Sequence, residues 1–573
     1  MSDQFPRVSE DVNMMLRVVP LLLLLGLVGC GGSSSHSDFV TPPAGPPTIA
    51  SLSPTSGVAG AAVTISGSNF GTERGSNTVT FNGQAASIAN WSDTGIVAKV
   101  PSGATSGDVV VTVASQTSNG IKFNVVTLPT GSIALSNFGF QCGPGDAADC
   151  EGSGKGVIAW PTSQAQPGLL RLHDAGTQWA NMDQGNGIYN WTNLDQWLDL
   201  IAAHQPVEVS QVFTWVPCWL AQPTNLAGCQ AAAPPTAPSG SNIPPPDLGT
   251  GPQGSSIAFN NFVSAFVSHC NPNNHCVKDL IRYYEMWNEW DLSFHWTGSM
   301  ADVYNLVAYP AVSIIKQTVP NAVILMPSST PDSDTGLTYQ CDFQNWLSYE
   351  DNHGYISDWI DWHVYLTAGD NATNSPEDQW SKYNANFLSI QAGGVVSGCL
   401  GGTPSSRWKN IPWANTETNF NGAPPPGLNY TCPAAQYSAA DCTGQIVRWQ
   451  LLHDSNGASG VFWYKWNETI GGNPQYEPAY NSMMQYLAGG KFNGPCGFTA
   501  AGGATTWTCA FTENGGKQAL WVWTPNEAGT SFSVPAGFVD YLDPTATPGT
   551  APTSVTAGQS ITIGPVPFML EQQ

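Results

Sequence analysis

Two glutamates stand at the ends of short, apolar, β-prone runs: Glu289 in residues 284–289 and Glu417 in residues 413–419. A pair of carboxyls far apart in the chain suits cleavage of a sugar acetal. One carboxyl protonates the leaving oxygen, and the other attacks the anomeric carbon or activates water. The alternative is that both are surface or strand-end glutamates. Because only 10% of the residues are charged, placing glutamates among Tyr, Met and Trp favours the catalytic interpretation.

The bulk composition narrows the function classes. The chain has 573 residues, enough for several domains and a large core. Its 17 basic and 41 acidic residues give a net charge of −24, which argues against binding nucleic acid or an anionic membrane through a basic face. The 22 tryptophans suit a carbohydrate cleft, where indole faces stack on sugar rings, although Trp also fills cores.

The N-terminus reads as a targeting segment. An apolar run over Leu21–Leu25, followed by Leu-Val-Gly-Cys ending at Cys30, resembles a bacterial lipoprotein signal over residues 1–29. The run is too short for a transmembrane helix. This resemblance implies lipidation of Cys30, a flexible tether over 30–45, and an exported protein that touches the outer membrane only through its anchor.

Cysteine usage fits an oxidising compartment. Setting aside Cys30 leaves twelve cysteines, an even number. Pairing them in sequence order predicts six bridges: 142–150, 218–229, 270–276, 341–399, 432–442 and 496–509. No CxxC motif is present and the nearby histidines complete no tetrahedral set, so we expect no metal site and no organic cofactor.

Three folded regions follow the tether. Residues 46–126 hold short alternating strands with Gly, Asn and Pro between them, which predicts an immunoglobulin-like β-sandwich. Residues 130–490 alternate strand-like and helix-like runs, which predicts a (β/α)8 barrel with its chemistry at the carboxyl ends of the strands. Residues 491–573 return to a β pattern and predict a C-terminal β-sandwich.

Specific elements are expected within the barrel region. Strands are predicted at 169–173, 207–213, 282–287, 323–326, 359–365, 413–416 and 460–466, and helices at 194–204, 259–267, 300–319 and 443–453. Long loops at 218–256 and 420–442 follow strand ends on the expected catalytic face and so are expected to shape a substrate cleft.

Two resemblances follow from these motifs. Ile49-x-x-Leu52-x-Pro54 and Thr64-Ile65-x-Gly67-x-x-Phe70-Gly71 resemble an IPT/TIG domain, which implies a spacer. The barrel resembles clan A retaining glycoside hydrolases, most nearly family 39. The matching residues are Arg171-x-His173, Glu285-x-Trp287-Asn288-Glu289, His363-x-Tyr365, Thr416-Glu417-x-Asn419 and Trp463.

The resemblance to glycoside hydrolases implies roles for single residues. It implies acid/base catalysis by Glu289 and nucleophilic attack by Glu417. Substrate binding would fall to Arg171, His173, Asn288, His363, Tyr365 and Trp463, with Arg171 and Tyr365 also orienting the nucleophile and Glu285 a buried partner. An apolar, Trp-lined pocket would help Glu289 keep its proton. Trp290 and Thr418 depart from the family pattern.

The expected partner is therefore a carbohydrate, a polysaccharide or oligosaccharide, and not a nucleic acid. Rival interpretations are an endo-glucanase or endo-mannanase of another clan A family, and a non-catalytic surface polysaccharide-binding lipoprotein, which would have no need of both carboxylates. A DNA-binding protein with an IPT-type domain conflicts with the acidic balance and the export signal. The sequence indicates neither the sugar nor the oligomeric state.

Overall fold

The computed structural model describes residues 45–573 except 54, 58–61, 102, 126–131, 142–157, 159, 161–165, 222–241, 248, 250–254, 294, 331–337, 367–374, 400, 421–431, 433–436, 472, 502–503 and 547–549. The signal segment, Cys30 and the tether thus lie outside the described residues, as does most of the two predicted long loops. None of the described helices is long and apolar enough to cross a membrane.

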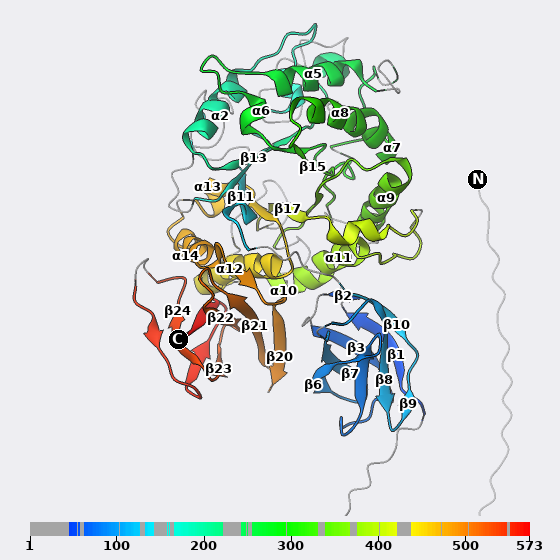
Figure 1. Cartoon of the computed structure of the whole chain (residues 1–573), viewed down its shortest axis with the longest axis vertical. Coiled ribbons are helices and arrows are strands. Elements are labelled where there is room, and N and C mark those ends of the chain that lie inside the picture. Colours follow the sequence, from blue (N-terminus) through cyan, green and yellow to red (C-terminus); the bar gives the residue numbers. More distant parts are fainter. Residues whose placement is uncertain are drawn as a thin grey trace, which may run out of the picture. The chain divides into compact units, whose positions relative to one another are not determined.

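The central region is a parallel eight-stranded barrel (Figure 1). Its strands are β11 (Phe138–Gln141), β12 (Leu169–Leu172), β13 (Glu208–Val212), β14 (Tyr283–Glu285), β15 (Val323–Leu325), β16 (Ile360–His363), β17 (Trp413–Thr418) and β18 (Gly460–Trp463). Neighbours follow chain order, and β18 pairs with β11. Parallel bridges Leu325↔Trp359 and Ser329↔Trp362 join the remaining edges, so the predicted barrel is confirmed.

The inside of the barrel is built in layers because strand side chains alternate with a period of two. One layer is apolar and contains Leu169, Tyr283, Leu325, Ala414 and Phe462. Gly139 leaves room for the Phe462 ring, since a Cβ there would lie 2.6 Å from it. Two residues further along four of these strands come Arg171, Glu285, Thr416 and Tyr464. The polar layer therefore lies at the carboxyl ends of the strands.

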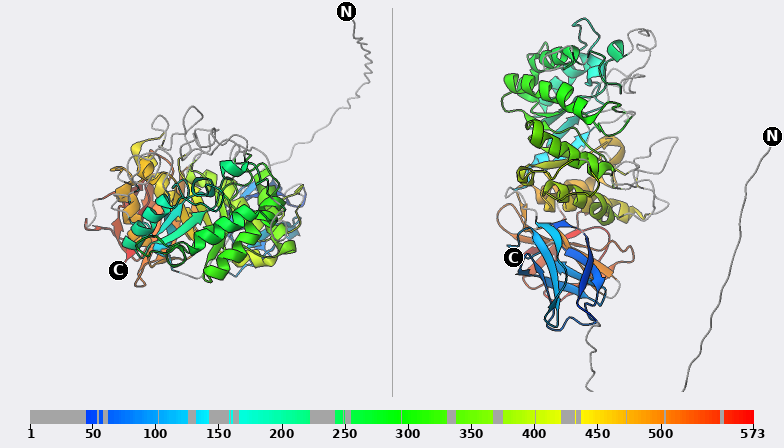
Figure 2. Two further views of the ribbon diagram at one scale, coloured as in Figure 1. Left: turned by 90° about the horizontal axis from the view of Figure 1, so that it is seen from above. Right: turned by 90° about the vertical axis from the view of Figure 1, so that its right-hand side faces the viewer.

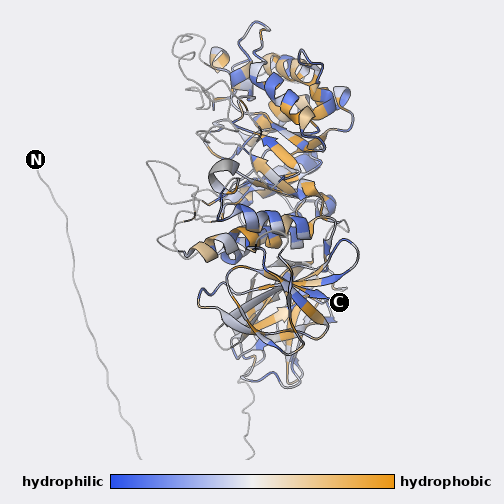
Figure 3. Cartoon of the chain, turned by 90° about the vertical axis from the view of Figure 1, so that its left-hand side faces the viewer, coloured by the Kyte–Doolittle hydropathy of each residue, from blue (hydrophilic) through white to orange (hydrophobic). Residues whose placement is uncertain are grey.

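Helices surround the strands (Figures 1 and 2). The longer ones are α2 (Thr192–Ala203), α5 (Ile257–Ser268), α8 (Tyr309–Thr318), α9 (Thr338–His353), α11 (Ala385–Gln391), α12 (Ala439–Ser455) and α14 (Glu477–Leu487). The short ones are α1 (Trp179–Met182), α3 (Cys218–Ala221), α6 (Val277–Leu280), α7 (Met300–Asp302), α10 (Pro376–Gln379) and α13 (Trp466–Thr469). Helix α2 buries Leu194, Trp197, Leu198 and Ile201, one face of a 3.6-residue period. Figure 3 shows such hydrophobic residues on the strands and on parts of the surrounding helices.

Some boundaries differ from those predicted. The first barrel strand, β11, is not among the strands predicted from the sequence. The strand predicted at 282–287 ends at Glu285. The helix predicted at 300–319 contains a π-helical stretch, Val303–Ala308, between α7 and α8.

The N-terminal domain is a sandwich of two mainly antiparallel sheets. One sheet has the order β1 (Thr48–Ser53), β3 (Ala62–Ser68), β7 (Gly95–Lys99), β6 (Ser87–Trp91). The other has β2 (Ser56–Gly57), β10 (Ile121–Val125), β8 (Gly107–Val113), β4 (Thr78–Phe81) and β5 (Gln84–Ala85), with β9 (Gln116–Thr117) on β8. Alternating residues such as Val109, Val111 and Val113 fill its core.

The C-terminal domain is also antiparallel β-structure, as predicted. Its main sheet comprises β19 (Lys491–Phe492), β21 (Ala504–Thr512), β22 (Gln518–Trp523), β27 (Phe568–Gln572), β24 (Phe538–Leu542) and β25 (Thr553–Ser554), with β20 (Gly497–Ala501) on β21. A second sheet pairs β23 (Thr530–Ser533) with β26 (Ser560–Ile563).

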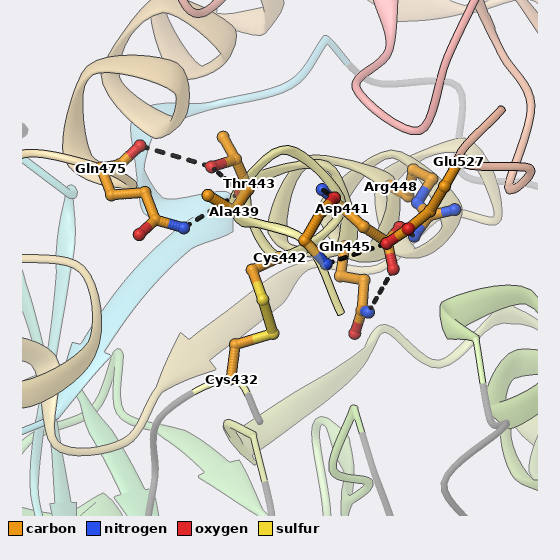
Figure 4. The surroundings of a disulfide bond; sticks show 10 residues. Cys432, Ala439, Asp441, Cys442, Thr443, Gln445, Arg448, Gln475 and Glu527 are labelled. Atoms are coloured by element: carbon orange, nitrogen blue, oxygen red, sulfur yellow. Dashed lines mark hydrogen bonds and ion pairs between the residues drawn. A yellow bond between two sulfur atoms is a disulfide. The ribbon is translucent and has the colours of Figure 1, made fainter. Parts of the chain in front are cut away.

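Four predicted disulfides are present: Cys270–Cys276, Cys341–Cys399, Cys432–Cys442 and Cys496–Cys509. The third ties the first turn of α12 to the segment before it (Figure 4). Cys218 is disulfide-bonded as well, whereas its predicted partner Cys229 and the pair 142–150 lie outside the described residues. These bridges indicate an oxidising, extracytoplasmic environment.

Candidate active site

Arg171, at the end of β12, is the centre of the polar layer. Its guanidinium has five N–H donors. Nε and Nη2 bond the two oxygens of Glu285 at 2.8 and 2.9 Å, and Nη2 also bonds Asn288 Oδ1 at 2.7 Å. Nη1 bonds Gln141 Oε1 at 2.5 Å and Glu417 Oε2 at 2.8 Å. All five donors are thus engaged, and the neighbouring carboxylates raise the Arg171 pKa in spite of the burial that opposes it.

Glu417, in β17, is held from both sides. Arg171 bonds one oxygen, and the Tyr365 hydroxyl donates a short hydrogen bond to the other. These two hydrogen bonds fix the direction of the carboxylate, and the side chain is 8% exposed, so an edge stays open.

Glu289 follows β14 in a left-handed backbone conformation, with φ of 46°, which L-residues adopt at a cost. Its backbone N–H bonds Ser328 Oγ at 2.9 Å. The carboxylate lies 3.0 Å from His295 Nδ1 and 2.8 Å from His363 Nδ1. Burial alone would raise the Glu289 pKa, but the hydrogen bonds from the two histidines outweigh it and lower the pKa.

This finding corrects the expected environment of Glu289. The sequence predicts an apolar, Trp-lined pocket that holds a proton on this carboxyl. The structure instead places two imidazoles against it, and they favour the carboxylate.

The two glutamates meet across the barrel. His363 Nδ1 lies 2.8 Å from Glu289 and 3.9 Å from Glu417. Oxygens of the two carboxylates lie within 4.8 Å of each other. Residues 128 positions apart in the chain thus face one small space.

His173 is oriented by its neighbours. Because Gln141 Oε1 accepts from Arg171, the Gln141 Nε2 atom must face His173 Nδ1, which lies 3.2 Å away. Nδ1 is therefore the acceptor. Burial and the charge of Arg171 lower the His173 pKa well below its usual value, so the ring is neutral and carries its proton on Nε2. That Nε2–H is buried with no partner among the described residues and can donate to a ligand.

Asp174, next in the chain, borders the same space in a left-handed conformation, with φ of 54°. Tyr464 donates to its carboxyl at 3.1 Å and Gln178 at 3.2 Å. Burial and the nearby charge of Glu417 raise the Asp174 pKa to about 7.

Trp463 does not join this cluster, which corrects the prediction that it binds substrate. It is fully buried and packs against Tyr480 of α14, with ring centroids 6.2 Å apart. The next residue, Tyr464, has the parity of Phe462 and reaches Asp174 instead. The aromatic that does lie among the site histidines is Trp215, whose ring is 6.4 Å from His173 and 6.2 Å from His295.

The other predicted residues gather at one end of the barrel, in partly different roles. Arg171 and His363 are fully buried and hold the carboxylates, so neither has an N–H free for substrate. Tyr365 bonds Glu417, and Asn288 turns its oxygen toward Arg171. Sequence reasoning missed Gln141, Asp174, Trp215, His295, Asp361 and Thr416. Asp361 and Thr416 could have been found because they lie near the ends of predicted strands, whereas no sequence pattern distinguishes the other four residues.

Two groups of side chains are close enough to share a cation: Glu289, His363 and Glu417, and Glu285, Asp361 and His363. Within both, the Arg171 guanidinium already supplies positive charge, bonded to Glu285 and Glu417. We therefore assign no metal to these groups.

Comparison with solved structures gives resemblances over most of the chain at low sequence identity. A family 39 glycoside hydrolase from Bacteroides cellulosilyticus has 15% identity and a TM-score of 0.45, covering 92% of this chain and 100% of that one. A glucosidase from Croceicoccus marinus has 12% identity and a TM-score of 0.45, covering 78% and 97%. A GH39 β-xylosidase from Caulobacter crescentus has 12% identity and a TM-score of 0.41, covering 78% and 99%.

Among curated proteins no sequence matches the chain. A family model does match its N-terminal region, the IPT/TIG domain model, over residues 47–126. The matched segment coincides with the two-sheet sandwich that follows the tether. Residues 47–126 are therefore an IPT/TIG domain, as the sequence pattern predicts.

Proposed function

We propose that this protein is a retaining glycoside hydrolase that cleaves O-glycosidic bonds of an oligosaccharide or polysaccharide by double displacement. The observation that carries the proposal is the approach of the Glu289 and Glu417 carboxylates, with oxygens within 4.8 Å. Retaining enzymes separate these groups by about 5–5.5 Å, whereas inverting enzymes leave about 6.5–9.5 Å for a water molecule.

In the first step Glu417 attacks the anomeric carbon. Arg171 and Tyr365 hold its carboxylate by one oxygen each, which fixes the direction of attack. Glu289 delivers a proton to the leaving oxygen as the glycosidic bond breaks, and a glycosyl ester forms on Glu417.

In the second step Glu289, again a carboxylate, removes a proton from water. The water attacks the anomeric carbon and releases Glu417. The hydrogen bonds from His295 and His363 suit Glu289 to this second step because they favour its ionised form. They also explain why the first step needs a proton supply beyond Glu289 itself.

The available donors suit a sugar with neutral hydroxyl groups. The His173 Nε2–H and the Trp215 Nε1–H are buried and lack partners among the described residues. Arg171 has no N–H left for a substrate carboxylate, and Glu289, Glu417 and Asp174 would repel one. An uncharged glycone is therefore the expected substrate.

The non-catalytic alternative, a surface polysaccharide-binding protein, predicts sugar binding without turnover. The same purified protein decides between the two: it is incubated with nitrophenyl glycosides of neutral sugars and with plant and microbial polysaccharides. Cleavage of any of them supports the hydrolase. The products distinguish exo from endo action, and the substrates cleaved distinguish an enzyme like those of family 39 from an endo-glucanase or endo-mannanase.

Mechanistic variants test the roles. We expect Glu417→Ala to abolish turnover, with azide restoring it as the inverted glycosyl azide. We expect Glu289→Ala to spare substrates with good leaving groups and to give the retained azide. Glu513→Ala is the control glutamate, in the turn between β21 and β22 of the C-terminal domain. Equal behaviour of the two site variants with every leaving group would overturn the assignment.

We also propose that the protein is exported and attached to the outer membrane by a lipid on Cys30. The described disulfides support export. Labelling of cells with a palmitate analogue should mark the wild type and not Cys30→Ala. Labelling of both would place the lipid elsewhere, and labelling of neither would remove the anchor.

A further inference from the structure

Four side chains form a continuous row of hydrogen-bonding groups beneath Glu289. Asp361 Oδ1 lies 2.6 Å from Thr416 Oγ1, which lies 3.1 Å from His363 Nε2. His363 Nδ1 lies 2.8 Å from Glu289 Oε1. Asp361, His363 and Thr416 are fully buried, so the row is closed to water except at Glu289.

The row exists because of an irregularity in β17. In the pairing of β16 with β17, Trp362 faces Asn415 and His363 faces Glu417, so Thr416 is an extra residue. A bulge of this kind re-aims a side chain. Two consecutive residues, Thr416 and Glu417, thereby both contact site groups, where regular alternation would turn one of them away.

The surroundings decide which atoms carry protons. His363 Nδ1 lies 2.8 Å from Glu289 Oε1, and a carboxylate oxygen only accepts, so Nδ1 carries a proton. The Arg171 guanidinium, 3.4 Å from Nε2, disfavours a second proton and a positive charge on the same ring. Nε2 is therefore the acceptor and Nδ1–H donates to Glu289. When Asp361 is ionised, Thr416 Oγ1–H donates to Asp361 Oδ1. When Asp361 is protonated, the same 2.6 Å contact runs in the opposite direction, and the Thr416 hydrogen can go to His363 Nε2.

Asp361 fits the role of donor. Its nearest charged neighbours are Glu285 on β14 and Arg171 on β12, and an oxygen of Glu285 lies within 4.8 Å of an oxygen of Asp361. The N–H groups of Arg171 are bonded to other residues, and Asp361 Oδ2 has no partner among the described residues. Burial and the charge of Glu285 raise the pKa of Asp361 well above its usual range, whereas the two histidines lower that of Glu289.

We propose, on the basis of the glycosidase function proposed above, that Asp361 stores the proton of the acid/base residue and passes it through Thr416 and His363 to Glu289. The Asp361 O–H bond breaks and Thr416 gains that hydrogen while giving its own to His363 Nε2. The His363 Nδ1–H bond breaks, and Glu289 receives this proton and gives it to the leaving oxygen.

The second step restores the row. Glu289 removes a proton from the attacking water, returns it to His363 Nδ1, and the other hydrogens shift back until Asp361 is protonated. One proton leaves Asp361 and one returns in each turnover, so no external acid is consumed. Transfer from Asp361 to Glu289 is uphill in the free protein, and the developing charge on the leaving oxygen draws it forward.

Three variants test the row by kinetics. Thr416→Val keeps the shape and removes the hydroxyl, Thr416→Ser keeps the hydroxyl, and Asp361→Asn keeps an N–H donor toward Thr416 but holds no transferable proton. On substrates with poor leaving groups we expect Thr416→Val and Asp361→Asn to lower kcat at least about 100-fold, the lower range for loss of general acid catalysis. We expect both to stay near wild type on dinitrophenyl glycosides, and Thr416→Ser to be active on both.

Several results would overturn the proposal. A purely orienting role for Asp361 predicts that Asp361→Asn matches wild type, since its amide donates to Thr416 as the protonated acid does. A purely structural role predicts equal losses on good and poor leaving groups, together with a lowered Tm. A Thr416→Ser variant as impaired as Thr416→Val would show that the hydroxyl is not the carrier.

A measurement without turnover separates this proposal from the function on which it rests. The 15N NMR shifts of His363 in the free protein, assigned with the His363→Gln variant, report which ring nitrogen is protonated. A proton on Nδ1 with Nε2 bare supports storage on Asp361, and a proton on Nε2 refutes it. If the wild type cleaves no glycoside, the proposed function fails, while the tautomer still decides where the proton resides.

Discussion

Replacement of Arg171 by Met should destabilise the barrel strongly. The change leaves Glu285 without the two hydrogen bonds at 2.8 and 2.9 Å, and removes the 2.8 Å ion pair to Glu417, with both Arg171 and Glu285 fully buried. Removing one partner of a buried ion pair costs about 3–5 kcal/mol, because the remaining charge stays uncompensated. For a barrel of roughly 350 residues this corresponds to a fall in Tm of about 4–7 °C.

Differential scanning calorimetry measures this effect against a matched control. Arg282→Met removes an ion pair to Glu208 at 3.3 Å whose side chains are 50% and 32% exposed, and such pairs contribute about 0–1 kcal/mol. Adding Glu285→Leu to Arg171→Met should recover part of the loss, because an apolar pair replaces the lone carboxylate. If Arg171→Met lowers the Tm no more than Arg282→Met, Arg171 is not the counter-ion that the buried carboxylates require.

Three further outcomes are expected. Burial raises the pKa of Asp454 to about 8, so the folded chain binds this proton more tightly than the unfolded chain, and stability falls as pH rises from roughly 4 through 8. Asp454→Asn should therefore raise the Tm at pH 9 but not at pH 4. An equal gain at both pH values would contradict this. Gly139→Ala should cost about 1–3 kcal/mol in urea unfolding, because the new Cβ would lie 2.6 Å from the Phe462 ring, and Phe462→Leu in the same chain should relieve it. Loss of Cys341–Cys399 through paired serine substitutions should lower stability more than loss of Cys270–Cys276. The two bridges span 58 and 6 residues, and the entropy that a bridge removes from the unfolded chain grows with loop length. The reverse order would show that native contacts dominate.

The sequence predicts the architecture well because periodicity is local. The alternation in residues 46–126 and the strand–helix repeat in 130–490 each follow from a face that must be buried, and the sandwich and the barrel are confirmed. The strand ends at Arg171, Glu285 and Thr416 carry the polar layer for the same reason: residues two positions apart in a strand share a face, and the apolar layer lies two positions earlier. Pairing of neighbouring cysteines also needs little more than chain proximity, and four such bridges are present.

The sequence by itself therefore determined most of the elements, their order and the strand ends at which polar residues gather. Only the tertiary structure decided which side chains meet, because the contacts join residues as far apart as the 246 positions between Arg171 and Glu417. Two backbone departures matter most: the left-handed turn at Glu289 and the bulge at Thr416. Neither has a sequence signature, yet the first places a carboxylate between two histidines, and the second puts the Thr416 hydroxyl within hydrogen-bonding distance of His363. The sequence analysis names Trp463 as a site residue, whereas in the structure Tyr464 reaches the site. Successive side chains of a strand point in opposite directions, so one position decides between the helices and the barrel interior.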